Sequence, residues 1–239
     1  MSTTSNRILC LLLGISGCTA SAHEDDLSAQ EPYAWVLTPD PGATGEWLER
    51  AGFAVAPLPL DRPPLGLPGV IVLGAEASDM PEYQRYMQAH AAGLSGFVER
   101  GGLLLQLAQS AEAEPAPPFL PATLMARRGP GDPGRARTRV DHPLLAEWPS
   151  AAWDADGDVF VAHAGFAGMV AEVDADAVLL AACHGRGEIV LAALALDRPR
   201  GEDPERDALA EDFAADLARH VACAGACAAS EPFRCPGSW

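Results

Sequence analysis

Short runs of continuously apolar residues most constrain the fold of this chain. Four of them recur along the sequence, at residues 33–38, 69–74, 102–107 and 188–194. Apolar residues at consecutive positions indicate strands buried on both faces, as in a parallel sheet covered by helices. Between the second and third runs, apolar side chains recur every three or four residues, which is typical of one helix face: Tyr83, Met87, His90, Leu94 and Phe97. The alternation of strands and helices predicts an α/β domain.

The remaining segments extend this pattern over residues 32–222. Residues 54–60 form an expected strand whose two prolines favour the edge of a sheet. Residues 177–182 and 188–194 flank a His-Gly-Arg-Gly turn, and together they predict a hairpin. A last helix begins near Pro204, and Asp79 is positioned to cap the helix before it in the chain. Residues 111–141, rich in proline and arginine, are interpreted as a long surface loop.

The N-terminal residues resemble an export signal. Arg7 precedes a compact apolar segment over residues 8–15 that is too short to span a membrane. The sequence Ile15-Ser16-Gly17-Cys18 resembles the bacterial lipobox, which implies removal of residues 1–17 and acylation of Cys18. Thr19, in place of an aspartate, favours the outer membrane. The alternative is an ordinary secretory signal with a chance cysteine.

Charge limits the partners of the exported chain. All 16 basic residues are arginine, and the chain has 33 acidic residues, so its net charge is -17. Such a balance argues against nucleic acid as a partner, because phosphates need a basic surface. Residues 18–31 are polar, acidic and without periodicity, and they predict a tether between the lipid and the domain. We therefore expect membrane attachment through the lipid on Cys18 alone.

The order of motifs resembles the class I glutamine amidotransferase-like superfamily, in particular its ThuA-like branches. The matching motifs are a helix with Trp-Leu-Glu-Arg-Ala-Gly-Phe, the step Arg100-Gly101-Gly102 into an apolar strand, Asp141-His142-Pro143, and Gly185-Arg186-Gly187 before the final strand. This resemblance implies a flavodoxin-like, doubly wound, mostly parallel sheet with a C-terminal β-hairpin and helix. It also implies ligand binding at the carboxyl edge of the strands.

The catalytic signature of that superfamily is missing. Residues 107–112 read Leu-Ala-Gln-Ser-Ala-Glu, without the cysteine and flanking glycines of a nucleophile elbow. A His-x-Glu pair is also absent, since His184 and Glu188 are too far apart. Ser110 with His163 as its base is a weaker catalytic hypothesis. The sequence therefore favours a non-catalytic domain but leaves catalysis through Ser110 open, and it indicates no cofactor.

Polar residues that follow strand ends are the expected ligand contacts, because such ends share one edge of a parallel sheet. They are Asp40, Glu76, Gln109 and Ser110. The alternative is that these side chains are merely solvated. A cluster of five arginines could bind a phosphate or carboxylate, or could balance nearby acids: Arg127, Arg128, Arg135, Arg137 and Arg139.

Acidic residues and cysteines raise the possibility of metal and disulfide sites. Asp154, Asp156 and Asp158 alternate as in calcium loops, but Val159 and Gly165 occupy the positions that need glycine and glutamate, so we expect a solvated turn. Cys10 leaves with the signal and Cys18 takes the lipid. The four remaining cysteines predict disulfides, with Cys183–Cys223 and Cys227–Cys235 preferred over a metal site. Residues 223–239 would then form a stapled tail.

These observations leave three functions. The first is a membrane-anchored envelope lipoprotein whose non-catalytic domain binds a glycan or an envelope partner. The second is a degenerate envelope hydrolase that uses Ser110. The third is a purely structural assembly lipoprotein without a small ligand. The missing elbow favours the first and third over the second.

Overall fold

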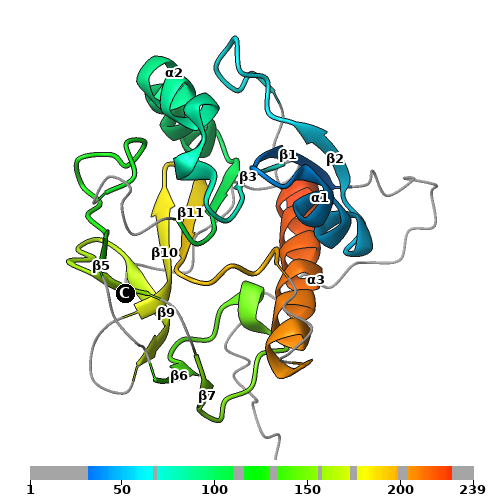
Figure 1. Cartoon of the computed structure of the whole chain (residues 1–239), viewed down its shortest axis with the longest axis vertical. Helices are drawn as coiled ribbons and strands as arrows, with labels where there is room; N and C mark the ends of the chain where they lie inside the picture. Colours follow the sequence, from blue (N-terminus) through cyan, green and yellow to red (C-terminus); the bar gives the residue numbers. More distant parts are fainter. Residues whose placement is uncertain are drawn as a thin grey trace, which may run out of the picture. The chain divides into compact units, whose positions relative to one another are not determined.

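The computed structural model describes residues 32–66, 69–109, 116–129, 134–155, 158–172, 177–198 and 204–227. Contacts divide the chain into residues 1–30 and 31–239, and every described element belongs to the second part. Over the described ranges, 11 strands join into one sheet with three α-helices (Figure 1). The predicted signal peptide, lipobox and tether lie outside these ranges.

One half of the sheet is parallel. Its strands lie in the order β2-β1-β3-β4-β11, and each pairs with its neighbours in parallel. We call them the parallel half: β1 (Tyr33–Leu37), β2 (Ala54–Pro57), β3 (Val70–Leu73), β4 (Leu103–Gln106) and β11 (Gly187–Ala192). The prediction that the strand with two prolines lies at an edge is confirmed, since β2 ends the sheet.

Helices on both faces explain why these strands are continuously apolar. Val70 and Val72 pack into the cluster that contains residues of α1 (Pro41–Arg50) and α3 (Pro204–Cys227). Ile71 and Leu73, which point the other way, pack with residues of α2 (Pro81–Glu99). Figure 1 shows α1 and α3 lying beside each other, with α2 apart from them. Successive side chains therefore enter two different cores.

The other half of the sheet is antiparallel. β10 (Ala177–His184) forms a hairpin with β11 and reverses the strand direction. β9 (Ala167–Glu172), β6 (Arg135–Thr138) and β7 (Trp153–Asp154) continue the sheet in that order. β8 (Val159–Val161) pairs with β10 and with β5 (Arg127–Gly129). We call these six strands the antiparallel half.

The predicted flavodoxin-like, mostly parallel sheet is therefore wrong. Only five of the 11 strands over the described ranges are in the parallel half, and the sheet is mixed. The physical reason lies in the predicted hairpin itself. It is present, and its first strand becomes the template for further antiparallel strands, whereas a parallel sheet would need a helical crossover at each step.

The prediction of a loop over residues 111–141 is also wrong in its described part. β5 and β6 lie within it, and Phe119 and Ala126 are buried there. The helix cap was misplaced as well. Asp79 belongs to a 3-10 turn, η1 (Ala77–Asp79), and Met80 is the residue that precedes α2. A second 3-10 turn, η2 (Pro143–Leu145), follows His142. None of the described helices has the length and apolar character to span a membrane.

Candidate functional site at the strand ends

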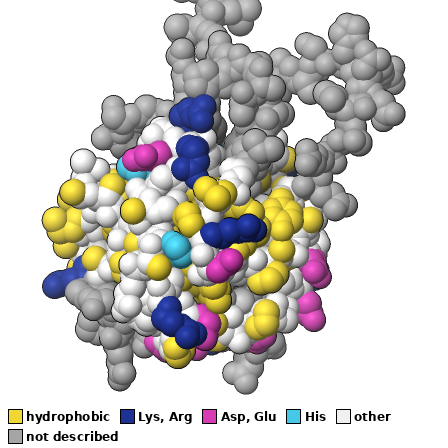
Figure 2. All heavy atoms as spheres, turned by 90° about the horizontal axis from the view of Figure 1, so that it is seen from above, with side chains coloured by type: hydrophobic (Ala, Val, Ile, Leu, Met, Phe, Trp, Pro, Cys, Tyr) yellow, Lys and Arg dark blue, Asp and Glu magenta, His cyan; other side chains and the backbone are white. Residues whose placement is uncertain are grey.

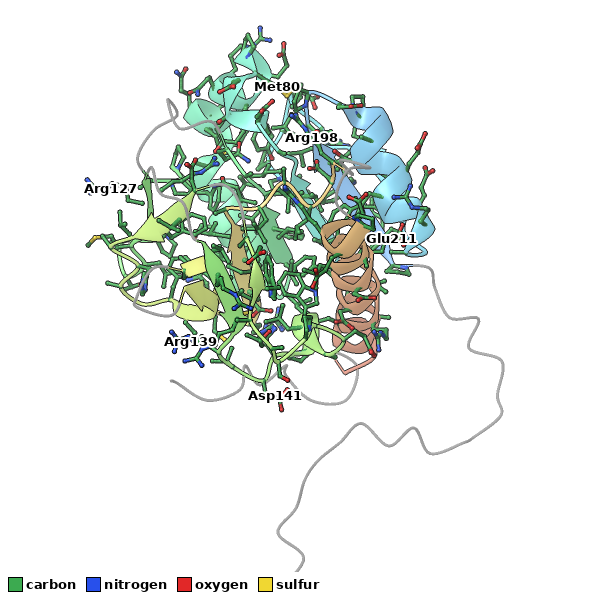
Figure 3. The ribbon with its side chains drawn as sticks, turned by 60° about the horizontal axis from the view of Figure 1, so that its bottom comes forward. Met80, Arg127, Arg139, Asp141, Arg198 and Glu211 are labelled. Carbon is green, nitrogen blue, oxygen red and sulfur yellow. The ribbon has the colours of Figure 1, made fainter. Side chains whose placement is uncertain are left out.

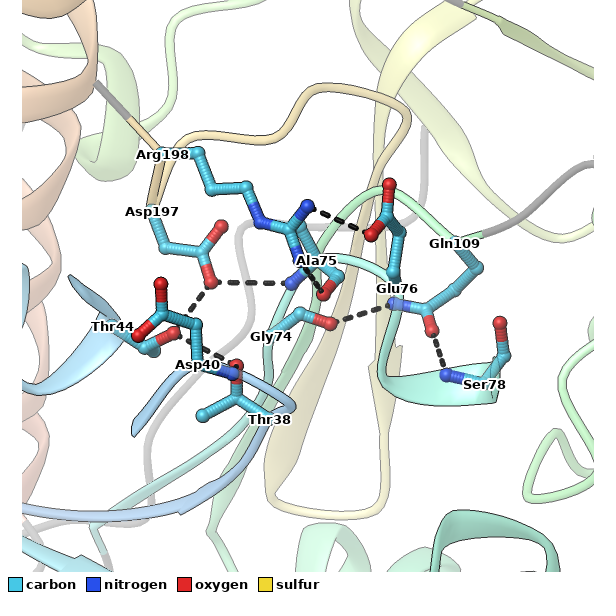
Figure 4. A network of polar contacts seen from close by, with 10 residues as sticks. All are labelled: Thr38, Asp40, Thr44, Gly74, Ala75, Glu76, Ser78, Gln109, Asp197 and Arg198. Atoms are coloured by element: carbon cyan, nitrogen blue, oxygen red, sulfur yellow. Dashed lines mark hydrogen bonds and ion pairs between the residues drawn. The ribbon is translucent and has the colours of Figure 1, made fainter. Parts of the chain in front are cut away.

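Polar side chains gather where the strands of the parallel half end (Figure 4). They follow β1, β3, β4 and β11, which all finish at the same edge of the sheet. We call this group the strand-end network: Thr38, Thr44, Ala75, Glu76, Ser78, Gln109, Asp197 and Arg198. Gly74 lies at its centre, and a Cβ there would collide with the Thr38 hydroxyl and approach Asp197. A glycine is therefore needed for the strand ends to come this close.

A buried carboxylate organises the network. Asp197 is 1% exposed, and its Oδ2 accepts hydrogen bonds from the Thr44 hydroxyl at 2.7 Å and the Ala75 amide at 3.2 Å. The Thr38 and Thr44 hydroxyls lie 3.0 Å apart, and because Thr44 donates to Asp197 it accepts from Thr38. The other carboxylate oxygen, Oδ1, has no hydrogen-bond partner among the residues that the structure describes. Asp197 thus ties the ends of β11, β3 and α1 together from inside the protein.

Gln109 was predicted as a ligand contact, but its side-chain amide forms hydrogen bonds with backbone groups. Its Oε1 accepts from the Ser78 amide at 2.7 Å. Its Nε2 donates to the Gly74 carbonyl at 3.1 Å and to the Leu107 carbonyl at 2.6 Å. The side chain is 7% exposed, so it holds the loop after β3 in place.

Glu76 and Arg198 form the exposed part of the network. Arg198 Nη1 lies 2.8 Å from Glu76 Oε2, and Nη2 donates to the Ala75 carbonyl at 3.0 Å. Their side chains are 55% and 33% exposed, so solvent and solutes reach both. Glu76 has φ 59°, a left-handed conformation that is costly for residues other than glycine and is often found at binding sites. Its amide is held by the Ala108 carbonyl at 2.7 Å.

The other predicted site residues have separate places. Asp40 is exposed and caps α1 by accepting from the Ala43 amide at 3.1 Å. Ser110 lies outside the described residues, so its predicted pairing with His163 stays a prediction. The strand-end network therefore contains two of the four predicted ligand contacts, Glu76 and Gln109 (Figure 4).

A serine and a histidine meet elsewhere, on the surface of α2. Ser95 Oγ lies 2.9 Å from His184 Nε2, and Glu99 Oε1 lies 3.1 Å from the same nitrogen. In a catalytic relay the serine and the carboxylate bind different nitrogens of the imidazole. Because both contacts here share Nε2, the arrangement is a surface hydrogen-bond cluster and does not activate Ser95.

A second buried network lies where β11 begins. Glu188 Oε1 is 2.9 Å from His142 Nε2, and Oε2 is 3.1 Å from His220 Nε2. Burial alone would raise the pKa of Glu188, but the hydrogen bonds from His142 and His220 outweigh it and lower the pKa to about 2. The three side chains connect β11, α3 and the residue before η2.

This histidine-glutamate network does not have the form of a metal site. His142 Nδ1 accepts the Leu144 amide proton at 3.2 Å, so the proton of the ring lies on Nε2 and points to Glu188. A metal on Nε2 would require the opposite tautomer. Over the described residues, no group of three or more histidine, cysteine or acidic side chains is placed to hold a metal ion.

The alternating aspartates are engaged with arginines. Asp158 lies 2.7 Å from Arg128, and Asp154 lies 3.7 Å from Arg135. Asp156 is outside the described residues. Cys183 is disulfide-bonded, while the side chains of the other three predicted cysteines are not described, so the predicted pairing stays a prediction.

Sequence reasoning missed Asp197, Arg198 and the partners of Glu188. Asp197 and Arg198 come directly after the last apolar run of the sequence, just as Glu76 comes directly after the run that contains β3. This shared position could have identified both residues as members of the site. Glu188 is a lone acid in an otherwise apolar strand, which indicates a buried partner. Nothing in the sequence pairs it with His142 and His220, which lie 46 and 32 residues away.

Comparison with known proteins gives a likeness in structure alone. No family profile and no curated sequence matches the chain. Among 29 similar solved chains is the cytoplasmic protein STM3548 from Salmonella typhimurium, with a TM-score of 0.54, 12% identity, and coverage of 80% of this chain and 98% of that one. The cytoplasmic protein STM1381 from Salmonella typhimurium LT2 has a TM-score of 0.53 and 13% identity, and the match covers 79% of this chain and 99% of that one.

Glycosidases form the other group. The β-galactosidase from Bacillus circulans sp. alkalophilus has a TM-score of 0.53 and 14% identity, and the match covers 84% of this chain and 32% of that one. The exo-β-1,4-mannosidase Op5Man5 from Opitutaceae bacterium strain TAV5 has a TM-score of 0.50 and 13% identity, and the match covers 78% of this chain and 35% of that one. The chain thus matches about a third of each glycosidase. At these identities the likeness shows the fold, and none of these four proteins is named a flavodoxin or an amidotransferase.

Proposed function

We propose that this protein is a lipid-anchored protein of the bacterial cell envelope, placed in the outer membrane, whose domain binds a glycan and does not catalyse a reaction. The anchor rests on the lipobox-like sequence that ends in Cys18. Binding without catalysis rests on residues 107–109 after β4, which include no cysteine, serine or glycine of a nucleophile elbow and end in Gln109. Its amide is fully used by backbone groups.

The observation that carries the binding proposal is the exposed Glu76–Arg198 pair. It offers a carboxylate acceptor and a guanidinium donor side by side, the combination that recognises adjacent sugar hydroxyl groups. The buried Asp197 and Gln109 fix the backbone beneath it, so little conformational entropy is lost on binding. The left-handed conformation of Glu76 is maintained by the same contacts.

The glycan as ligand is supported by the names of similar structures. A mannosidase and β-galactosidases share the fold, although only about a third of each is matched. β-Linked mannose and galactose oligosaccharides are therefore the first ligands to test. An envelope protein as partner is the alternative, and it would be recognised by failure of all glycans together with capture of a defined protein by the same pair.

The anchor is tested by labelling cells that express the full chain with a palmitate analogue. The wild-type chain should take up the label, and Cys18→Ser should lose it and retain residues 1–17. A chain that is exported and cleaved without label would contradict the lipoprotein proposal and favour an ordinary secretory signal.

Ligand binding is tested by calorimetric titration of the full chain, in nonionic detergent, with β-1,4-mannan and β-galactan oligosaccharides. Arg198→Gln should weaken binding about tenfold, since a charged hydrogen bond contributes about 1.5–3 kcal/mol. Arg85→Gln is the matched control, because Arg85 pairs with Glu82 at 2.6 Å on the exposed surface of α2. Equal losses in both variants would contradict the assignment to the strand ends.

A further inference from the structure

A small pocket lies where the first turns of α3 meet the chain around β7. Its volume is about 240 Å³, part of which is open to solvent. We call it the tryptophan pocket. The chain around β7 contributes Trp148, Trp153 and Asp154 to its lining. The segment after β11 and the first two turns of α3 contribute the remaining residues: Leu194, Leu196, Arg206 and Leu209.

The two tryptophan rings are held firmly by their neighbours. Trp148 and Trp153 are each 6% exposed, and their rings meet edge to face with centroids 5.7 Å apart. The Trp148 ring also packs against Phe213 of α3, with centroids 6.0 Å apart. Because close packing leaves such rings little freedom to rotate, the positions of their N–H groups are fixed before any ligand binds.

Both indole N–H groups lack an acceptor. Neither the Nε1 atom of Trp148 nor that of Trp153 has a hydrogen-bond partner among the residues that the structure describes, and both atoms are buried. A buried tryptophan normally donates this N–H group, as Trp47 does to the Ala210 carbonyl at 2.9 Å. An unpaired buried donor is costly, so two of them around one pocket indicate an acceptor that comes from outside the described protein.

The lining side chains favour a ligand that has acceptor atoms and no donor. Arg206 has donors and no acceptor, as have the two indoles. Among the described residues of the lining, Asp154 is the only acid, and its side chain is 95% exposed and lies 3.7 Å from Arg135. An amide or hydroxyl group in the pocket would therefore bring a donor without a side-chain partner. A carboxylate has two acceptor oxygens and no donor, which matches the two indoles.

The start of α3 also favours a negative charge. Arg206 lies in the first turn of this 24-residue helix, where the peptide dipoles leave a partial positive charge. The acids of that turn, Glu205 and Asp207, do not line the pocket. Figure 3 shows the next acid of the helix, Glu211, beside α1. On the face shown in Figure 2, by contrast, acidic and basic side chains are interspersed, so an anion bound there would meet charges of both signs.

Three buried leucines give the pocket an apolar wall. Leu194, Leu196 and Leu209 are each less than 5% exposed, and they suit a short alkyl group. The volume is below the range of about 300–1,000 Å³ that holds drug-sized ligands, so the ligand has few atoms.

We propose that the tryptophan pocket binds a short-chain aliphatic carboxylate, whose oxygens accept hydrogen bonds from the indole N–H groups of Trp148 and Trp153. The alkyl group of this ligand packs against the leucines. The pocket shares no residue with the strand-end network, so the inference goes beyond the proposed function.

The test is nuclear magnetic resonance on the full chain, labelled with nitrogen-15, in nonionic detergent. The chain has five tryptophans and therefore five indole N–H signals. Titration with sodium isobutyrate should shift the signals of Trp148 and Trp153 until they saturate. The Trp47 signal should stay in place, because its N–H group already donates to the backbone. Isobutyramide has nearly the same shape but no charge, and it should bind at least tenfold more weakly.

Two variants remove one donor each and keep an aromatic ring. Trp148→Phe and Trp153→Phe should each weaken isobutyrate binding about tenfold, the loss expected for one hydrogen bond to a charged acceptor. Trp35→Phe is the matched control and should leave binding unchanged, because Trp35 lies outside the pocket and packs with Phe97 of α2. Thermal melting checks that each variant is folded. The wild-type titration decides the proposal if a variant does not fold.

Other outcomes would overturn the inference. If isobutyrate produced no saturable shift of either indole signal, water alone would supply the missing acceptors. Shifts with sodium chloride and none with isobutyrate would assign the pocket to an inorganic anion. Equal binding of isobutyramide would remove the selection for a carboxylate. Equal weakening by Trp35→Phe would mean that the effect of the variants is indirect.

Failure of the proposed function is separate. Arg198→Gln should leave isobutyrate binding unchanged, since Arg198 does not line the pocket. Loss of isobutyrate binding in that variant would place the carboxylate at the strand ends and overturn the inference. If neutral oligosaccharides fail to bind while isobutyrate binds, the glycan proposal fails and the pocket stands.

Discussion

The parallel and antiparallel halves of the sheet differ in which side chains they bury and which they expose. In β3 and β4 every residue is buried, and apart from Gln106 the polar groups come after the strands end. In β6 exposed arginines alternate with the buried Ala136 and the partly buried Thr138. A strand between two helical layers cannot offer side chains to a ligand, so its binding chemistry moves to the strand ends. A strand with one open face can present a row of side chains directly.

The largest loss of stability is expected from the buried charge of Glu188 in β11. Glu188→Ala should cost about 3–5 kcal/mol in the free energy of unfolding, because two buried imidazoles lose their acceptor. Urea denaturation followed by circular dichroism measures it. A cost below about 1 kcal/mol would contradict the view that this network joins α3 to the sheet.

A matched pair of truncations compares the two halves directly. Leu105→Ala in β4 should cost about 3 kcal/mol, because its side chain is fully buried between strands and helices. Val161→Ala in β8 should cost under about 1 kcal/mol, since its side chain is only partly buried. Similar costs in chemical denaturation would remove the distinction in packing between the halves.

Acid should affect the protein through Glu188. Its pKa is lowered from 4.5 to about 2 in the folded state, so the folded state favours the ionised carboxylate. The resulting stability is fully present above about pH 4.5 and is lost as the pH falls toward 2. Thermal melting between pH 6 and pH 2 should show this loss in the wild type. Glu188→Gln should start less stable and show a shallower decline over that range; a parallel decline would assign acid sensitivity to other groups.

Two threonines allow the stability contribution of a single hydroxyl group to be compared between the two halves. Thr44→Val should cost about 1–2 kcal/mol, because Asp197 loses a buried hydrogen bond. Thr138→Val on β6 should cost less than about 0.5 kcal/mol, since its 3.3 Å contact with the Pro149 carbonyl is part-buried. The order of the two midpoints in urea is the measurement, and its reversal would contradict the role of Asp197.

The smallest effect on stability is expected at the exposed face of β6. Arg137→Ser should change the free energy of unfolding by less than about 0.5 kcal/mol, because the side chain is exposed. A larger loss in urea denaturation would mean that Arg137 makes contacts that stabilise the fold.

The sequence predicted the parallel half well because continuous apolar runs mark strands buried on both faces. Residues 69–74 and 102–107 contain β3 and β4, and the hairpin turn lies between β10 and β11 as expected. The strand-end residues followed from the same logic, since Glu76 and Gln109 come directly after these strands. The roles of these residues could not be predicted, because only the folded structure shows that the Gln109 amide hydrogen-bonds to backbone groups.

The antiparallel half was harder to predict because its signals conflict. Arginine and proline content suggested a loop, although residues 135–139 alternate between arginine and small residues with the period of a strand. Long-range partners such as His142 and His220 leave no local signal at all. The lone Glu188 in an apolar strand indicated that some partner exists, and the fold decides which one.

Nuclear magnetic resonance mapping on the full chain of 25.0 kDa tests the central claim most directly. A neutral β-1,4-mannan or β-galactan oligosaccharide is titrated in, and the backbone amide shifts are followed. We expect the shifts to concentrate at residues 74–76 and at Arg198, with the amides of β6 unchanged. Shifts confined to the antiparallel half, or no saturable shifts with either oligosaccharide, would contradict a glycan-binding site at the strand ends.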